Sequence, residues 1–440
     1  MRAGWVWLAS FTLYPLIGAP LLIHRVFRPF GLAARVVLAG GVGAVLLSWS
    51  MTAFALAGWR WGPSLVLMSA ALAFALRGLI LSPPTDAPAE SPRGAPRWVW
   101  IAHAVTGISI LAALAATVAA RSTSLDLLFF WGPKAQQFAS ARTIDAAYLG
   151  TPNFEYLHVY YPPLVTNVFA LGAMVAGRFP WGAATLTFPL LLAATAVALF
   201  GILKTARPAP AAAAATALTT SALALVGIRA AVAGNAEPFL LFFEVSAIAL
   251  LLTPAAGNAG VQLLAGCLLA GAASSKVEGL PFVLAVTVLF LLLERRRAWP
   301  LWRSALFLLA PTVVSVATWL AFGATRKIFY GYRGYGRVSE FHWAHTPAIL
   351  AAIGSALWKA SYALPFAVPL LVVLLAGRQL TRAAQLPLGV AAGMSAFLLL
   401  TYLQSGSDPA LWISWSAARV FSPVTAMIAL ASFCAAERAP

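Results

Sequence analysis

Charged side chains are scarce in this sequence. Asp, Glu, Lys and Arg make up 9% of its 440 residues, whereas 61% of the residues are apolar. An ordinary soluble domain carries about a quarter charged residues. So few charges cannot cover the surface of a water-soluble fold of this length. Apolar runs recur from residue 3 to residue 436 and indicate an integral membrane protein with many spans.

Cysteine and the common motifs of soluble enzymes are also nearly absent. The two cysteines, Cys267 and Cys434, lie inside apolar runs, which argues against a disulfide framework and a metal site. No HExxH, Walker or GxGxxG pattern is present. The apolar runs are continuous instead of alternating, which excludes an outer-membrane barrel and predicts helices.

The apolar runs predict an all-α polytopic transmembrane bundle with about thirteen spans. The expected spans are 3–24, 33–58, 62–82, 98–120, 181–203, 209–232, 238–255, 259–274, 279–294, 300–322, 361–377, 384–403 and 418–436. The run at 163–177 has only about 15 residues and, at about 1.5 Å per residue, is too short for a membrane core of about 30 Å. We therefore expect interfacial or partly re-entrant helices in the segment that contains it.

Polar stretches divide the chain into parts. Residues 1–82 predict an N-terminal three-helix membrane addition, and the Pro-rich stretch 83–97 predicts a flexible cytoplasmic linker. Residues 98–436 form the main membrane module, interrupted by non-spanning segments at 121–180, 323–360 and 404–417. Basic residues gather in the short loops between the other spans, and all of these loops fall on one membrane face, which should be the cytoplasmic one. By the positive-inside rule, these three non-spanning segments face outward from the cell membrane.

The net charge of +17 has a membrane explanation. On a soluble chain it would suggest nucleic acid, but here the basic residues stand at the ends of apolar runs, where lipid headgroups lie. We therefore expect a lipid bilayer and no nucleic acid as a partner.

The acidic residues nearest to apolar runs are functional candidates, because an ionisable group is costly there. Asp126 follows span 98–120 within aromatic residues; its alternative role is a structural pair with Arg121 or Lys134. Glu237 precedes Pro238 at an outward helix start, where it could simply complement the helix dipole. Glu244 lies one or two turns deeper, and at that position a structural charge with a partner is expected more often than a catalytic residue.

Two further groups carry charge at outward helix ends. Lys276 and Glu278 stand close together and predict either a local ion pair or a phosphate contact by the lysine. Trp412, Ser416 and Arg419 have the spacing of one helix face, which is also typical of an aromatic belt with a snorkelling arginine.

The remaining candidates are histidines. His342 and His345 are close enough in sequence to reach one ligand, and an ordinary interfacial pair is the alternative. The sequence does not identify metal ligands, so a divalent cation such as Mg²⁺ or Mn²⁺ is left open as a cofactor.

These residues together resemble the motifs of the GT-C superfamily, polytopic glycosyltransferases that use polyprenyl-phosphate sugars, such as protein mannosyltransferases and lipid A aminoarabinose transferases. Five elements occur in order over residues 98–436: Asp126-x4-Trp131-x2-Lys134, Tyr161-Pro-Pro-Leu164, Gly-Asn-Ala-Glu237-Pro, Lys276-x-Glu278-Gly, and Trp412-x3-Ser416-x2-Arg419. Many relatives carry the first acid after their first span, so 1–82 is expected as an addition.

The resemblance implies an inverting transferase that moves a sugar from a polyprenyl-phosphate donor to an extracytoplasmic glycan, lipid or protein acceptor. It implies Asp126 and Glu237 as catalytic residues. Donor-phosphate contacts are expected from Lys134, Lys276, Arg419, Arg333 and Arg337, and substrate contacts from Trp131, Tyr161, Glu278, Trp412, Ser416, His342 and His345. The chemistry agrees, because transfer needs a base for the acceptor hydroxyl and cations for the leaving phosphate.

Two other functions remain open at this point. A transporter or flippase of lipid-linked sugars would carry charges along a path through several helix centres, where only Arg77, Glu244 and Arg229 qualify. A noncatalytic membrane scaffold is the third alternative.

Overall fold

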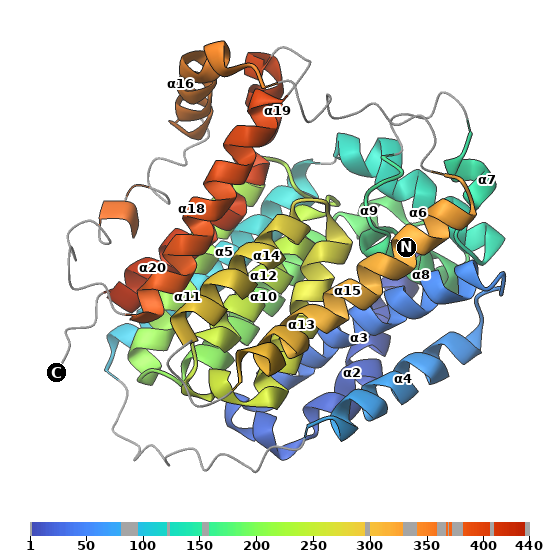
Figure 1. Cartoon of the computed structure of the whole chain (residues 1–440), viewed down its shortest axis with the longest axis horizontal. Helices are drawn as coiled ribbons and strands as arrows, with labels where there is room; N and C mark the ends of the chain where they lie inside the picture. Colours follow the sequence, from blue (N-terminus) through green and yellow to red (C-terminus); the bar gives the residue numbers. More distant parts are fainter. Residues whose placement is uncertain are drawn as a thin grey trace.

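The computed structural model describes residues 2–80, 96–120, 124–151, 158–294, 300–328, 341–358, 367, 369–371, 382–404 and 409–435. Within these ranges the chain folds into helices joined by turns and contains no strand. Figure 1 shows the helices as one bundle, with α16 (Thr346–Leu357) at one end, beside α19 (Pro409–Val420). The prediction of an all-α fold is confirmed.

Long apolar helices identify a membrane-embedded protein. In the described residues, seven helices are long and apolar enough to cross a membrane: Arg2–Leu22 (α1 and α2), Leu32–Leu56 (α3), Trp98–Ala120 (α5), Trp181–Leu203 (α9 and α10), Ala209–Arg229 (α11), Leu301–Thr325 (α15) and Ala383–Leu403 in α18. An eighth span results if α19 (Pro409–Val420) and α20 (Ser422–Ala435), bent by 43°, are counted together.

The count of thirteen spans is not confirmed. Shorter helices occupy four of the expected spans: α4 (Pro63–Gly78), α12 (Glu237–Leu251), α13 (Ala259–Ser275) and α14 (Gly279–Glu294). They have 15 to 17 residues. At about 1.5 Å per residue they reach about 22–26 Å, less than a membrane core of about 30 Å. The expected span 361–377 lies largely outside the described residues.

Two of the short helices form the centre of the bundle. Every residue of α12 and of α13 is buried. α13 packs against α3, α12, α14 and α15, and α12 also packs against α10 (Thr187–Leu203), as Figure 1 shows. Helices that are apolar all round are stable only when they are surrounded by protein or lipid. Functional side chains at the ends of α12 and α13 are therefore held by the most enclosed part of the fold.

The first large polar segment contributes short helices beside this core. They are α6 (Gly132–Ala141), α7 (Ala146–Leu149) and α8 (Leu164–Ala176). The short helix α9 (Trp181–Ala184) follows them and begins the span Trp181–Leu203. Residues 164–173 of α8 are all buried, and α8 packs against α1 (Arg2–Ser10), α3 and α6. Asn167 on α8 donates hydrogen bonds to the carbonyl oxygen and hydroxyl of Ser48 on α3, at 3.2 and 3.1 Å. The interfacial position of these helices in a membrane stays a prediction.

The remaining elements complete the bundle and its caps. They are α2 (Leu13–Leu22), η1 (Arg25–Phe30), η2 (Leu127–Trp131), η4 (Pro254–Gly257), η5 (Trp343–His345), α16 (Thr346–Leu357) and α18 (Arg382–Leu403). α18 packs against α14 and α20, and α16 packs against α19. α16 also contacts α18, so it is held by both helices.

Candidate functional site

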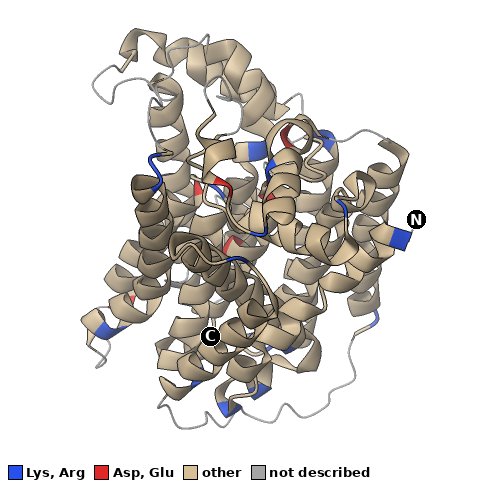
Figure 2. Cartoon of the chain, turned by 90° about the vertical axis from the view of Figure 1, so that its right-hand side faces the viewer, with Lys and Arg blue, Asp and Glu red and all other residues tan. Residues whose placement is uncertain are grey.

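Five charged side chains, which we call the charged cluster, meet at helix ends. Arg419 Nη1 lies 2.5 Å from Asp126 Oδ2 and 3.7 Å from Glu237 Oε1. Lys276 Nζ lies 3.1 Å from Glu237 Oε1 and 3.0 Å from Glu278 Oε1. Figure 2 shows acidic and basic segments close together within the bundle. Residues separated by as many as 293 positions thus form one connected network.

Helix ends explain why these charges are tolerated there. Glu237 is the first residue of α12 and Glu278 directly precedes α14, whereas Arg419 lies in the last turn of α19. Lys276 follows the last residue of α13 with an extended backbone, φ −155° and ψ 156°. Helix dipoles favour acids at amino-terminal ends and cations at carboxy-terminal ends. Each of these four charges therefore has the sign that its own helix end favours.

The segment that carries Asp126 is fixed to the segment that carries Glu237. The Ser124 hydroxyl donates to Asn235 Oδ1 and accepts a 3.1 Å bond from the backbone N–H of Leu127. Gly234 has φ +86°, and a Cβ built there would lie 2.5 Å from Leu127 Cδ2. Only glycine tolerates this conformation and this close approach without strain. The two acids are thereby held in register across 111 residues of sequence.

Burial and pairing set the protonation of the cluster. Burial raises the pKa of Asp126, an effect that Arg419 opposes and Glu237 reinforces. Burial alone would lower the pKa of Lys276, but Glu237 and Glu278 reverse this and raise it. Lys276 therefore remains a fixed cation, and Asp126 is a stronger base than an ordinary surface carboxylate.

Two buried carboxylate oxygens of the cluster lack a hydrogen-bond donor within the described part of the chain. They are Glu237 Oε2 and Glu278 Oε2, and both atoms are buried. A buried acceptor without a donor is costly and indicates a place for a water molecule or a ligand donor. Among the same residues, no group of three or more His, Cys, Asp and Glu side chains is arranged to hold a metal ion.

An aromatic group lies beside the charged cluster. The turn Leu127–Trp131 is π-helical, a feature frequent at functional sites. The Phe130 and Tyr161 rings are stacked at 6.1 Å, and the Trp131 ring lies 5.7 Å from Tyr161. Tyr161 interacts electrostatically with Arg419 of the cluster. This arrangement links the Tyr-Pro-Pro-Leu element to the segment of Asp126.

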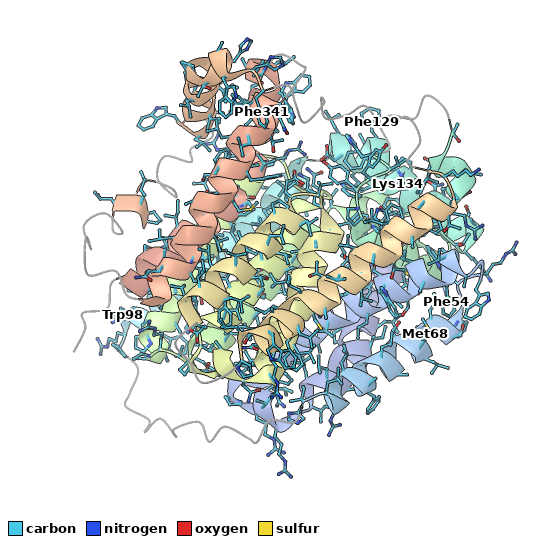
Figure 3. The ribbon with its side chains drawn as sticks, in the orientation of Figure 1. Phe54, Met68, Trp98, Phe129, Lys134 and Phe341 are labelled. Carbon is cyan, nitrogen blue, oxygen red and sulfur yellow. The ribbon has the colours of Figure 1, made fainter. Side chains whose placement is uncertain are left out.

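Lys134 lies within this aromatic group and has an unusual environment for a lysine. Its side chain, labelled in Figure 3, comes from α6. Lys134 is 3% exposed, and its Nζ lies 4.7 Å from the centre of the Trp131 ring and 5.4 Å from that of Phe130. Burial lowers the pKa of Lys134 to about 7. The ammonium therefore gains or loses its proton near neutral pH, unlike Lys276.

His158 adjoins the same aromatic group. Its ring lies 4.9 Å from Phe130 and 5.1 Å from Tyr161. Burial, together with the charges of Lys134 and Lys276, lowers the pKa of His158 to about 4. His158 is therefore neutral at physiological pH and adds no charge to the site.

The W-x3-S-x2-R element reaches the site through one face of α19. The Ser416 hydroxyl lies 2.8 Å from the Tyr402 hydroxyl of α18, and the Tyr402 ring packs edge-on against Trp412 at 4.9 Å. Tyr402 is close enough to interact electrostatically with Lys276, Glu278 and Arg419. Trp412 and Ser416 thus lie on one face of α19, as predicted, and both contact Tyr402.

The structure brings most of the predicted site residues together, but not the histidine pair. The rings of His342 and His345 lie 5.7 Å apart on an exposed turn, and the described structure has no contact between them and the charged cluster. Arg333 and Arg337 lie outside the described residues. The local ion pair between Lys276 and Glu278 is present, and Asp126 pairs with Arg419.

Sequence reasoning missed several residues of this site. Ser124 and Asn235 each lie two residues before a candidate acid, and this closeness in sequence was the one feature that could have pointed to them. Phe130 and His158 could be noticed in the sequence only because they lie next to the Asp126 and Tyr161 motifs. Tyr402 lies in an apolar helix without any motif and could not have been found from the sequence.

Comparisons with known proteins do not place the chain in a family. No family model, no curated protein and no solved structure matches it.

Proposed function

We propose that this protein is an inverting glycosyltransferase of GT-C type that takes a sugar from a polyprenyl-phosphate carrier. The observation that supports the proposal is the charged cluster. Its members come from four separate segments, and all five are residues whose motifs resemble that superfamily. A cluster of buried and half-buried acids and cations beside aromatic rings has the groups that this reaction requires.

The proposed base is Asp126. Its Oδ2 binds Arg419, and its Oδ1 has no hydrogen bond to the described residues, so Oδ1 is available to an acceptor hydroxyl. The acceptor oxygen attacks the anomeric carbon of the sugar, and its proton passes to Asp126. The bond between that carbon and the phosphate oxygen breaks at the same time. The products are the glycosylated acceptor with inverted configuration and the polyprenyl phosphate.

The cations stabilise the leaving group. The carrier phosphate gains one negative charge when the sugar leaves, so donors aimed at it lower the barrier. Arg419 offers five N–H donors and Lys276 three, more than their carboxylate partners among the described residues occupy. Lys134 is the third proposed contact, because a phosphate would favour its protonated form.

Other groups complete the proposed substrate site. Glu237 Oε2 and Glu278 Oε2 need hydrogen-bond donors, which sugar or acceptor hydroxyls supply. The rings of Trp131 and Tyr161 offer apolar faces to a sugar ring. A requirement for a divalent cation stays a prediction. Transfer assays with and without Mg²⁺ or Mn²⁺ test it. The site is proposed to face the extracytoplasmic side of the cell membrane.

One observation favours a second function, the transport of lipid-linked sugars. Glu244 lies on α12, seven residues after Glu237 and on the same helix face, and it is fully buried. Neither of its carboxyl oxygens has a hydrogen-bond partner in the described part of the chain. A protonatable acid at such a position is a feature of proton-coupled transporters.

Proteoliposomes distinguish the two functions. The purified protein is reconstituted with a radiolabelled polyprenyl-phosphate sugar and a mixture of extracytoplasmic acceptors. A transferase releases polyprenyl phosphate and labels an acceptor, and Glu244→Gln retains this activity. If the labelled carrier only changes leaflets, without loss of its sugar, the transferase proposal is wrong and the transporter is supported.

A further inference from the structure

A cavity separate from the charged cluster lies between the start of the chain and the corner after α8. Its volume is about 370 Å³, and its walls are Gly4 of α1 and residues 178–183. This volume falls in the range of about 300–1,000 Å³ that is common for small-molecule sites. α1 and α9 pack against each other here, so the cavity lies between two parts of one structure.

The expected level of the cavity in a membrane follows from the apolar spans that begin beside it. The apolar spans Arg2–Leu22 and Trp181–Leu203 both begin at the cavity wall. The ends of membrane spans lie at the level of the lipid headgroups, where Trp and Arg are favoured. We therefore expect the cavity to lie at the level of the lipid headgroups.

The lining favours an anion. Arg178 is exposed at the cavity, and none of the lining residues is acidic. The Phe179 and Trp181 rings lie 4.8 Å apart and form an apolar wall. A Cβ built on Gly182 meets no atom within 4 Å, so this side of the cavity is open.

We propose that this cavity binds the phosphate headgroup of an anionic membrane lipid, with Arg178 as the phosphate contact. An arginine guanidinium matches phosphate oxygens in geometry and charge. The apolar wall and the position at the end of two spans suit the glycerol backbone and the first carbons of the chains. This inference needs only a membrane-embedded protein and is independent of glycosyl transfer.

The cavity also adjoins the candidate site structurally. The Trp181 ring packs closely on Gly132, the first residue of α6, so closely that a Cβ on Gly132 would overlap it. α6 carries Lys134. A lipid in the cavity contacts Trp181 and thereby supports the start of α6.

Native mass spectrometry of the detergent-purified chain tests the proposal. It is titrated with phosphatidylglycerol and, separately, with phosphatidylcholine. The wild type is expected to bind one phosphatidylglycerol more tightly than phosphatidylcholine. Arg178→Gln removes a charge-assisted bond and should weaken that site at least about 10-fold. Gly182→Leu fills open space and should also weaken it.

Arg60→Gln is the matched control, because Arg60 is also exposed but does not line the cavity. It should bind phosphatidylglycerol as the wild type does. A second readout is the melting temperature, which phosphatidylglycerol should raise in the wild type more than in Arg178→Gln. The proposal is overturned if Arg178→Gln binds phosphatidylglycerol with wild-type affinity, or if the wild type does not prefer it to phosphatidylcholine.

Discussion

Replacing Lys276 by Met should destabilise the fold strongly. The Lys276 ammonium forms ion pairs with two carboxylates, those of Glu237 at 3.1 Å and Glu278 at 3.0 Å. Without it, Arg419 at 3.7 Å is the one charged partner left to Glu237 among the described residues, and the Glu237 side chain is 2% exposed. Removing one partner of a buried ion pair costs about 3–5 kcal/mol, because the other charge is left buried. We expect Lys276→Met to lower the free energy of unfolding by about 3 kcal/mol or more.

Reversible unfolding in mixed micelles, followed by tryptophan fluorescence, measures this loss. The control is Lys327→Met, which changes an exposed lysine and should cost less than about 1 kcal/mol. Adding Glu237→Gln and Glu278→Gln to Lys276→Met removes the orphaned charges and should restore much of the stability. If Lys276→Met alone costs less than about 1 kcal/mol, the ion pairs described here do not hold the cluster together.

Three further predictions follow from single features. Gly234→Ala should destabilise the fold and slow any transfer, because φ +86° and the contact with Leu127 both oppose a Cβ; unfolding and transfer assays measure the two effects, and Gly78→Ala, at a glycine with open space around it, is the matched control. Donor affinity should be constant below pH 7 and fall above it, because Lys134 with a pKa of about 7 must gain a proton to hold a phosphate; binding titrations should show a flat profile for Lys134→Arg. Cysteines placed at Asp145 and Ala183 should react with an impermeant reagent from the same side, and reaction from opposite sides would contradict the predicted topology.

The helical fold and the membrane location could be predicted from apolar runs alone. The number of spans could not, because run length does not distinguish a crossing helix from one enclosed by protein. α12 and α13 show the difficulty: their sequences are as apolar as a span, yet they have 15 and 17 residues and are buried along their whole length. Burial inside a bundle and burial in lipid favour the same residues.

The candidate site was predicted as separate pieces, and the structure supplied their partners. Glu237, Lys276 and Arg419 could each be recognised as charges at helix ends. That Arg419 pairs with Asp126 across 293 residues depends on how α19 packs, which no local pattern encodes. Tyr402 shows the same limit, since its contact with Ser416 joins two helices without any motif. Local patterns predict which residues are unusual, and tertiary packing decides which of them meet.

The turnover of Asp126→Asn shows whether Asp126 is the base of a glycosyl transfer. The amide keeps the shape of the side chain but cannot accept the acceptor proton, and a general base contributes about 10²–10⁴-fold to rate. We predict that the variant folds, binds a polyprenyl-phosphate sugar donor with near wild-type affinity, and loses turnover by a factor in that range. Glu237→Gln should lose less if Glu237 only orients the acceptor. Wild-type turnover by Asp126→Asn with every acceptor that the wild type glycosylates would contradict the assignment and leave Asp126 as the structural partner of Arg419.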